Sequence, residues 1–384
     1  MTPLEQTSTC FGPTLPPEIT DSIIHQFHSS SPDLRVCSLV CRAWLPASRY
    51  QLFSSLSLRG EDIPKFVDLI ASPENTYSSS LRAITIIYGE NGPMSLLLLR
   101  LLDFRSLRSM KIRLSMICSE FPTMPHITFL KLDAILFQSF SAFITFLIRF
   151  PGLKILVLRH LGWGPDRDSK DPVQSITALR LELEQLSIEN SHNLQLLSWL
   201  SDVELAPLTS SLSLDLTGRM GRKIIPDVAE YLHHLRTHLK HLHLQLHTIA
   251  RFLEKLDFSL HTALQSLRIH SAVEFSGYSW QWSLCVDPML LQVLKLVCAP
   301  HIKELTLRVV PVRRCKLIIQ DTSASLQLLL SVLHLPHLAT LRKIQFYWPW
   351  NSDPEARDNF TSIVLDKLPT LASRSVVLVD SSPS

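Results

Sequence analysis

The 384-residue sequence is poor in glycine and in charged residues. It contains only 10 glycines, and 18% of its residues are charged, below the ~25% of an average soluble domain. So little glycine excludes collagen-like and glycine-rich low-complexity chains, and a 46% share of hydrophobic residues excludes a disordered chain. Glu and Lys are too sparse at heptad flanking positions for a long coiled coil. The 70 leucines instead indicate a folded protein with a large apolar core.

Paired cysteines, long apolar runs and clustered charge are also scarce. The seven cysteines are odd in number and include no Cys-x-x-Cys pair, so neither a disulfide framework nor a zinc site is expected. The longest uncharged apolar run, residues 134–148, is shorter than the ~20 residues that span a bilayer. Residues 1–10 have no apolar core of the secretory type. The net charge of +3 forms no basic stripe. We therefore expect an intracellular protein, cytoplasmic and/or nuclear, that binds neither a membrane nor a nucleic acid.

Motifs of the common enzyme classes are missing as well. The sequence contains no GxSxG, P-loop, GxGxxG or HExxH. A loop beginning at Asp166 resembles the start of a calcium site, but Asp171 and Thr177 stand where an EF-hand requires Gly and Glu. His234 and His238 are spaced for a shared metal on a helix, but no nearby carboxylate or cysteine completes a site. We expect no enzyme activity, no metal and no cofactor.

Residues 15–58 predict three short helices. Pro16 and Pro17 suit a first helical turn, and Ile19, Ile23, Ile24 and Phe27 then recur on one helical face. Ser31 is expected to cap a second helix, and a third is expected to begin near residues 45–46. The second helix is apolar nearly all the way round, so it must be buried on more than one side. A module of this size cannot supply that cover by itself, so the cover comes from the rest of the chain or from a partner.

Three segments of this helical region follow a known order. They are LPPEI at residues 15–19, SLVCRAW at 38–44 and RYQLF at 49–53. With this order, residues 15–53 resemble the F-box of fungal F-box proteins. The resemblance implies docking onto a Skp-type adaptor, which connects the chain to a cullin and a RING subunit. By the same resemblance, the docking face is formed or supported by Leu15, Pro16, Ile19, Ile23, Leu34, Leu39, Val40 and Trp44.

A helical cap over the end of a larger domain is the alternative interpretation of this region. A cap would explain why the second helix is so apolar. It would not explain an ordered match over both halves of the segment, so the F-box-like interpretation is preferred.

Behind the helical region, a Leu-x-x-Leu-x-Leu pattern recurs. Its copies start at residues 81, 107, 127, 153, 183, 209, 239, 264, 291, 302 and 341, mostly 25 to 30 residues apart. This is the period of leucine-rich repeats, in which each unit supplies a strand and a helix. Alternating leucines would face the core, and the polar residues between them the open sheet face. An ordinary α/β sheet, buried on both faces, would instead show continuous apolar strands.

The pattern places helices between the strands, but it is irregular. Helices are expected at 94–103, 137–150, 192–200, 226–235, 249–256 and 323–334. Since the step from 302 to 341 is too long for one unit, residues 315–319 (CKLII) are predicted to add a strand within it.

These elements together predict an α/β fold: an N-terminal three-helix F-box module followed by an irregular leucine-rich-repeat-like solenoid, or horseshoe. We expect a flexible tail at 1–11, the F-box at 12–58, a linker helix at 59–80, the solenoid at 81–380 and a tail at 381–384.

His241, His243 and His247 alternate with leucines along one predicted strand. In a regular strand all three project from the same, open sheet face, and the resemblance to leucine-rich repeats implies that targets bind there. Imidazoles with a pKa near ~6.5 gain charge together on mild acidification. Target binding through this stripe should therefore change between about pH 7.5 and 6. The alternative is a solvated strand face without function. Aromatic residues at 278–282 and 347–350 fit either core packing or a binding surface.

The function implied by the resemblance is that of a non-enzymatic substrate adaptor. The chain would recruit an unknown target protein to a cullin–RING (SCF-type) ubiquitin ligase, with the solenoid holding the target. A non-degradative F-box interaction scaffold is the alternative.

Overall fold

The computed structural model divides the chain into two compact units, Met1–Ile112 and Arg113–Ser384. It describes residues 15–28, 30–72, 79–87, 94–113, 121–163, 181–189, 194–202, 206–216, 221–246, 258–276, 283–286, 301–310, 335–347 and 376–380, with short pieces at 290–291, 294–295, 297, 299, 329, 331–333, 358, 361–362 and 365–366. Each unit combines helices with parallel strands, so the predicted α/β class is confirmed. Of the helices in these ranges, none has the length and apolar character needed to cross a membrane.

The first unit begins with the three expected helices, α1 (Pro17–Gln26), α2 (Ser31–Val40) and α3 (Leu45–Ser54). Each has a proline in its first turn, where the missing N–H costs no helical hydrogen bond. The predicted cap at Ser31 is wrong by one position: Ser30 precedes α2, and its side chain makes no cap hydrogen bond. The difference arises because Pro32 is tolerated throughout the first turn, so it does not fix the start.

Fewer sides of α2 are buried than its apolar composition predicts. Leu34 and Cys37 are buried. Val36, Leu39 and Val40, on the remaining sides, are 65%, 84% and 57% exposed. The described part of the chain therefore covers one side of this helix and leaves the others open.

The remainder of the first unit is already part of a parallel sheet. It contains β1 (Ser55–Arg59), the 3₁₀ turn η1 (Gly60–Asp62), α4 (Ile63–Ala71), β2 (Ala83–Ile87), α5 (Met94–Leu101) and β3 (Ser109–Arg113). β1 pairs in parallel with β2, with Leu56 opposite Ile84. The sheet thus begins at Ser55 and not at the predicted residue 81. The expected linker helix exists as α4, but it lies between two strands of the sheet.

Tyr50 and Arg82 connect the three helices to these strands. The Arg82 guanidinium lies 5.5 Å from the centre of the Tyr50 ring and donates a hydrogen bond to its hydroxyl. The backbone N–H of Arg82 also donates to the Ser54 carbonyl at the end of α3, over 2.8 Å. These contacts explain why the helical module and the first strands form one compact unit.

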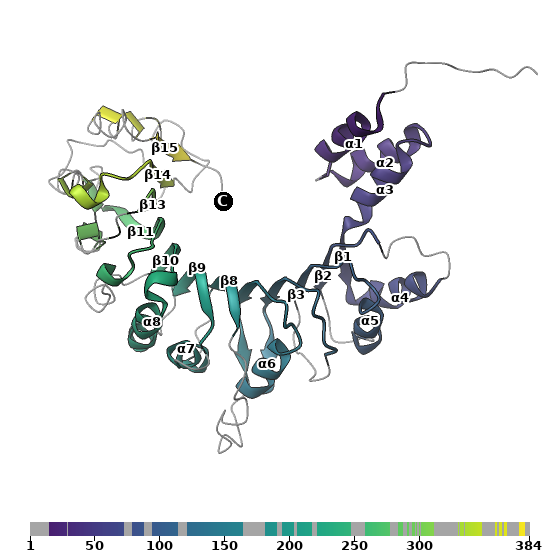
Figure 1. Ribbon diagram of the computed structural model, residues 1–384, viewed down its shortest axis with the longest axis horizontal. Coiled ribbons are helices and arrows are strands. Elements are labelled where there is room, and N and C mark those ends of the chain that lie inside the picture. Colours follow the sequence, from purple (N-terminus) through teal and green to yellow (C-terminus); the bar gives the residue numbers. More distant parts are fainter. Residues whose placement is uncertain are drawn as a thin grey trace, which may run out of the picture. The chain divides into compact units, whose positions relative to one another are not determined.

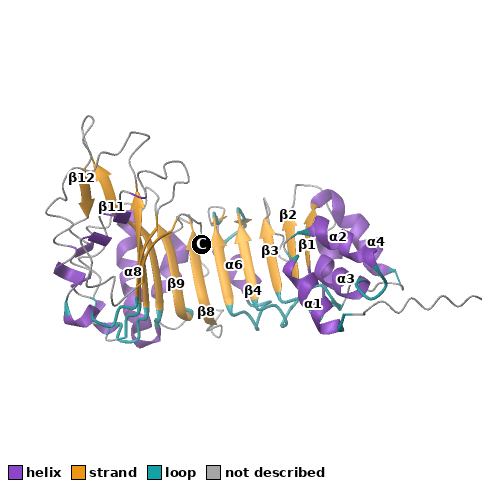
Figure 2. Ribbon diagram, turned by 90° about the horizontal axis from the view of Figure 1, so that it is seen from above, coloured by secondary structure: helices purple, strands orange, loops and turns teal. Residues whose placement is uncertain are grey.

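The second unit is a parallel sheet with one helix-covered face (Figures 1 and 2). Its strands are, in spatial order, β4 (Phe129–Asp133), β6 (Ile155–Arg159), β8 (Glu182–Glu189), β9 (Leu208–Leu216), β10 (His241–Leu246), β11 (Ser266–Ser276), β13 (Glu304–Val310), β14 (Lys343–Tyr347) and β15 (Val376–Asp380). α6 (Phe140–Leu147), α7 (Leu194–Ser201) and α8 (Gly221–Leu235) lie along one side of these strands (Figure 1). We call the opposite side the inner face.

Smaller elements connect these strands and helices. β5 (Leu136–Phe137) pairs with β7 (Gly162–Trp163) in a separate two-stranded sheet. β12 (Ser283–Val286) folds back on β11 as an antiparallel hairpin (Figure 2). Short 3₁₀ turns are η3 (Arg236–His238), η4 (Phe258–Leu260) and η5 (Pro336–Leu338).

The repeated leucines form a register-matched ladder inside the second unit. Leu156, Leu186, Leu212, Leu242 and Leu267 lie opposite one another across successive strands, and each is at most 2% exposed. The same backbone hydrogen bond recurs from repeat to repeat, just before a strand begins. For example, the N–H of Lys240 donates to the Ser210 carbonyl over 2.8 Å. The predicted alternation of inward leucines and outward polar residues is therefore confirmed, and the arrangement is leucine-rich-repeat-like.

One predicted strand is wrong. The copy at 291–296 is helical wherever it is described, at Leu290–Leu291 and Leu294–Lys295. β13 pairs in parallel with β14, with Leu305 opposite Ile344. Residues 315–319 lie outside the described ranges, as does the helix predicted at 249–256. The helices expected at 94–103, 137–150, 192–200 and 226–235 are confirmed, with α8 beginning five residues early.

The ladder predicts very different costs for neighbouring substitutions on β10. Leu242 is 2% exposed, whereas His241 points to solvent on the inner face. We expect Leu242→Ala to lower the free energy of unfolding by about 2–5 kcal/mol. His241→Ala should change it by less than about 0.5 kcal/mol. Chemical denaturation of both variants measures the difference, and equal tolerance at the two positions would contradict the assigned faces.

Candidate functional site

The first candidate site is a set of exposed apolar side chains on α1, on α2 and just before α1. Leu15, Ile19, Val36, Leu39 and Val40 are all among the large apolar residues that remain exposed. Val36 and Val40 are one helical turn apart, so they share a side of α2. We call these five residues the apolar helical set.

The residues predicted to form or support a docking face occupy three different environments. Leu15, Pro16, Ile19, Leu39 and Val40 are exposed. Ile23 and Trp44 are half-buried, and Leu34 is buried at 2% exposure. Leu34 can therefore support the face but cannot contribute surface to it.

Sequence reasoning missed Val36, which is 65% exposed. The sequence predicts only that the second helix is buried on more than one side, because an isolated sequence does not distinguish the covered side of an apolar helix from an uncovered one. The spacing of four residues between Val36 and Val40 was the available signal.

A small core holds the helices of this set. Ile24 of α1, and Leu34 and Cys37 of α2, are buried. Thr20 of α1 is also buried, at 5% exposure. Gln51 of α3 lies 3.2 Å from the His25 imidazole of α1, so these two helices also have a polar contact.

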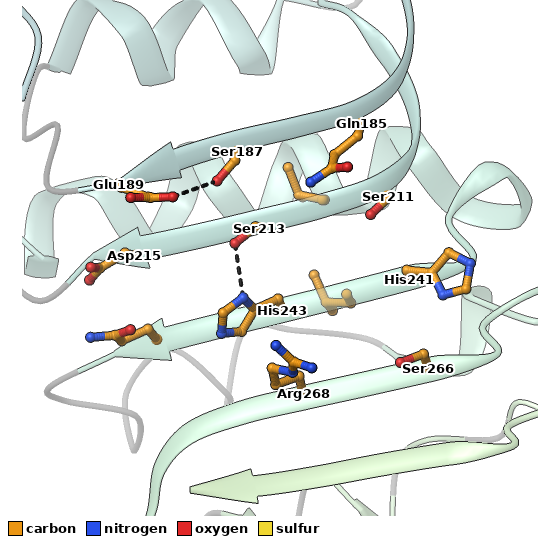
Figure 3. Close-up of a pocket in the computed structure, with 13 residues that line it drawn as sticks. Gln185, Ser187, Glu189, Ser211, Ser213, Asp215, His241, His243, Ser266 and Arg268 are labelled. Atoms are coloured by element: carbon orange, nitrogen blue, oxygen red, sulfur yellow. Dashed lines mark hydrogen bonds between the residues drawn. The ribbon is translucent and has the colours of Figure 1, made fainter. Parts of the chain in front are cut away.

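The second candidate site is a groove on the inner face of the second unit (Figure 3). Its volume is about 470 Å³, and it crosses four adjacent strands, β8 to β11. Only two of its lining residues are apolar, Leu212 and Leu242, and their side chains are buried in the core. The others are Gln185, Ser187, Glu189, Ser211, Ser213, Asp215, His241, His243, Gln245, Ser266 and Arg268. We call it the inner-face groove.

Strand register arranges these polar side chains in rows. The middle row contains Ser187, Ser213, His243 and Arg268, each opposite the next on the neighbouring strand. Gln185, Ser211, His241 and Ser266 form a row two residues earlier, and Glu189, Asp215 and Gln245 a row two residues later. Because all four strands run parallel, the carboxylates lie together at the carboxyl ends of β8 and β9 (Figure 3).

Hydrogen bonds and charge further define the groove. The Ser213 hydroxyl and His243 Nδ1 are 3.0 Å apart, and the Ser187 hydroxyl donates to Glu189 over 3.3 Å. Arg159 Nε lies 3.8 Å from Glu189 Oε2, outside the groove lining. His243 and Arg268 are half-buried, whereas His241 is exposed. The middle of the groove thus presents serine hydroxyls, an imidazole and a guanidinium, and one end presents two carboxylates.

Two of the three predicted target-binding histidines lie in this groove. His241 and His243 project from the same face of β10, as the alternation predicted. His247 lies outside the described residues, after the end of β10 at Leu246. Sequence reasoning missed Arg268 and Ser213. In each repeat, one residue stands between the last two apolar residues of the Leu-x-x-Leu-x-Leu pattern. Ser213, His243 and Arg268 all occupy this position, so comparing it between successive repeats would have identified Ser213 and Arg268.

Other residues considered for metal binding do not come together. Among the residues that the structure describes, no group of three or more His, Cys, Asp or Glu could hold a metal ion. His234 belongs to α8 and His238 to the following 3₁₀ turn, so the assumed helical spacing between them is interrupted. The aspartate-containing loop from residue 166 and the aromatic group at 278–282 lie outside the described ranges.

Comparisons with known proteins add little to this geometry. None of the family models matches the chain, and no curated protein is significantly similar to it. Among solved structures, the crystal structure of a TLR13–ssRNA13 complex matches with a TM-score of 0.33 and 14% sequence identity. The match covers 87% of this chain and 41% of that chain, so this chain spans less than half of the solved chain's length. A match of this quality identifies neither a function nor a ligand for this chain.

Proposed function

We propose that the chain is a substrate-recognition adaptor of an SCF-type cullin–RING ubiquitin ligase. In this proposal α1–α3 dock onto a Skp-type adaptor, and the inner-face groove binds the target protein. The observation that carries the proposal is the exposure of the apolar helical set within the segment whose sequence resembles an F-box.

The exposed leucine and valines of α2 support docking on physical grounds. Leu39 is 84% exposed beside Val40 at 57%, and Val36 lies one turn earlier at 65%. Clustered exposed apolar side chains typically mark interaction sites on soluble proteins. Burying such surface stabilises a complex by about 25 cal/mol per Å² before the costs of association are subtracted. A partner that covers this helix would provide the burial that its composition calls for.

The inner-face groove favours binding over catalysis. Ser213 and His243 form a hydrogen-bonded hydroxyl–imidazole pair, which is the beginning of a nucleophilic site. Acyl transfer also needs N–H donors aimed at the developing oxyanion. The backbone around Ser213 is engaged on both sides in the parallel sheet, with β8 and with β10. The pair is therefore better explained as part of a recognition surface than as a catalytic dyad.

Charged substitutions on α2 test the docking step. We expect Leu39→Asp combined with Val40→Asp to weaken co-purification of the full-length chain with a fungal Skp-type adaptor by about thirtyfold or more, because each buried apolar contact becomes a buried charge. Leu69→Asp is the matched control, since Leu69 is an exposed leucine of α4 in the same unit. Equal adaptor recovery from the α2 variant and the control, with both folded by circular dichroism, would overturn the docking assignment.

The non-degradative scaffold is distinguished by what the bound adaptor recruits. If the adaptor complex contains a cullin and ubiquitin is transferred to proteins captured by the second unit, the ligase function is supported. If the adaptor binds but neither cullin nor ubiquitin transfer accompanies it, the scaffold is the correct function.

A further inference from the structure

We propose that the inner-face groove is an anion-recognition site, in which Arg268 and His243 hold a carboxylate or phosphate side chain of a bound protein segment. The inference deepens the proposed function, because it names the chemistry by which the groove would recognise its target. It concerns the second unit alone, so it can be tested without the Skp-type adaptor.

The middle row of the groove combines the groups that bind anions. Ser213, His243 and Arg268 are paired in register across β9, β10 and β11. Neighbouring strands are about 4.8 Å apart, so these three side chains span about 10 Å. Ser213 and His243 Nδ1 are hydrogen-bonded to each other, so the donors that remain for an anion are mainly the five N–H groups of the Arg268 guanidinium. A protonated His243 would add its positive charge beside them. Figure 3 shows the Arg268 guanidinium beside the His243 ring, on the open side of the strands.

Partial burial strengthens this row as an anion site. Arg268, His243 and Ser213 are each half-buried in a groove of about 470 Å³. Hydrogen bonds between ionised partners are roughly twice as strong as neutral ones. They also weaken less with salt when water is partly excluded. The guanidinium fork additionally matches the paired oxygens of a carboxylate or phosphate.

The carboxylates at the end of the groove favour a second, positively charged side chain on the bound segment. Glu189 and Asp215 lie two residues further along their strands than the middle row, about 7 Å away. Arg159 and the Ser187 hydroxyl already contact Glu189. In an extended peptide, side chains two residues apart point the same way at a similar spacing. A segment with an anionic residue and a basic residue two positions away therefore complements both the middle row and the carboxylate end of the groove.

The groove also predicts the direction of a pH effect. The charged or titratable groups facing His243 are Asp215 on β9, His241 on its own strand and Arg268 on β11, with Glu189 further across on β8. Acidification from about pH 7.5 to 6 adds positive charge to histidines while ordinary carboxylates stay ionised. Binding of a carboxylate should therefore strengthen as the pH falls through this range, whereas a phosphate loses negative charge over the same range because its second pKa is ~6.

Inorganic phosphate is the first probe, applied to the full-length protein with isotope-labelled histidine. Millimolar phosphate should shift the His243 ring resonance, which is assigned by its disappearance in His243→Gln. Sodium chloride at the same ionic strength should not shift it. Arg268→Gln should abolish the response, and Arg342→Gln, an exposed arginine outside the groove, should preserve it. A response that survives Arg268→Gln, or no response in the wild type, overturns the proposal.

Alanine-based peptides then distinguish the two anion sources. Each carries a lysine two positions after a central serine, glutamate or phosphoserine. If phosphoserine alone binds about tenfold or more above serine, the site reads phosphate; if glutamate does so too, a carboxylate suffices. Equal binding of all three peptides overturns the proposal. Adaptor recovery is measured separately, so a failed anion site and a failed docking assignment give different results.

Discussion

Gly152→Ala is expected to lower the free energy of unfolding of the second unit by at least about 3 kcal/mol, at the upper end of overpacking costs. A Cβ atom at Gly152 would lie 2.2 Å from the Pro125 carbonyl oxygen and 3.3 Å from its carbon. Both atoms belong to the backbone, so no side-chain rotation relieves the clash. Gly152 precedes β6, and moving it would shift the start of that strand against β4. Chemical denaturation monitored by circular dichroism measures the loss.

Gly162→Ala is the matched control for this prediction. Its added Cβ would approach only the end of the Leu136 side chain, at 3.2 Å, and Leu136 can move because it is largely exposed. The control should cost less than about 1 kcal/mol, as is usual for substitutions outside the core. If the two variants are equally stable, the backbone approach at Gly152 is not a constraint on the fold.

The repeat and its alternation could be predicted because they are properties of short segments. Each Leu-x-x-Leu-x-Leu copy determines which side chains face inward, and parallel pairing requires a crossover connection between successive copies, which the spacing of 25 to 30 residues allows. The ladder from Leu156 to Leu267 is the direct result. The same logic identifies a copy that sequence reasoning missed: Phe53, Leu56 and Leu58 fit the pattern at β1. It was overlooked because Phe53 also belongs to the F-box-like segment.

The strand predicted at 291–296 was wrong because this segment fits both the strand pattern and a helical pattern. Residues 291–296 match the strand pattern, but Leu290, Leu291 and Leu294 also share one helical face. The next copy begins at Ile302, too soon for a complete strand-and-helix unit, and this spacing favoured the helix that the structure has. β15 was missed for the opposite reason, because Arg374 stands where the pattern requires a leucine.

The candidate sites depended on information that a single segment does not contain. The histidines of β10 were visible as a local alternation. Arg268 and Ser213 join His243 only through the register of three strands whose residues are 25 and 30 positions away in the sequence. Likewise, the exposure of Val36 depends on which side of α2 the other helices cover.

Phe143→Ala is expected to destabilise the second unit by about 3–5 kcal/mol, the usual cost of removing a fully buried phenylalanine. Phe143 of α6 is 0% exposed and lies within an aromatic cluster behind the sheet. Its ring centre is 5.3 Å from that of Phe137 on β5, 6.2 Å from Trp163 on β7 and 6.1 Å from Trp199 on α7. Removing the Phe143 ring would leave a cavity between side chains of three other elements, and none of these side chains can fill it alone.

The measurement is again denaturant unfolding, with two comparison variants. Phe143→Leu should retain a substantial part of the stability, because a leucine fills much of the space, and Leu136→Ala should have little effect since Leu136 is 45% exposed on the neighbouring strand β5. Adaptor recovery by Phe143→Ala at low temperature should equal that of the wild type, because the apolar helical set belongs to the other compact unit. A loss of adaptor binding that parallels the loss of stability would show that the second unit is needed to hold α1–α3 in their docking-competent form.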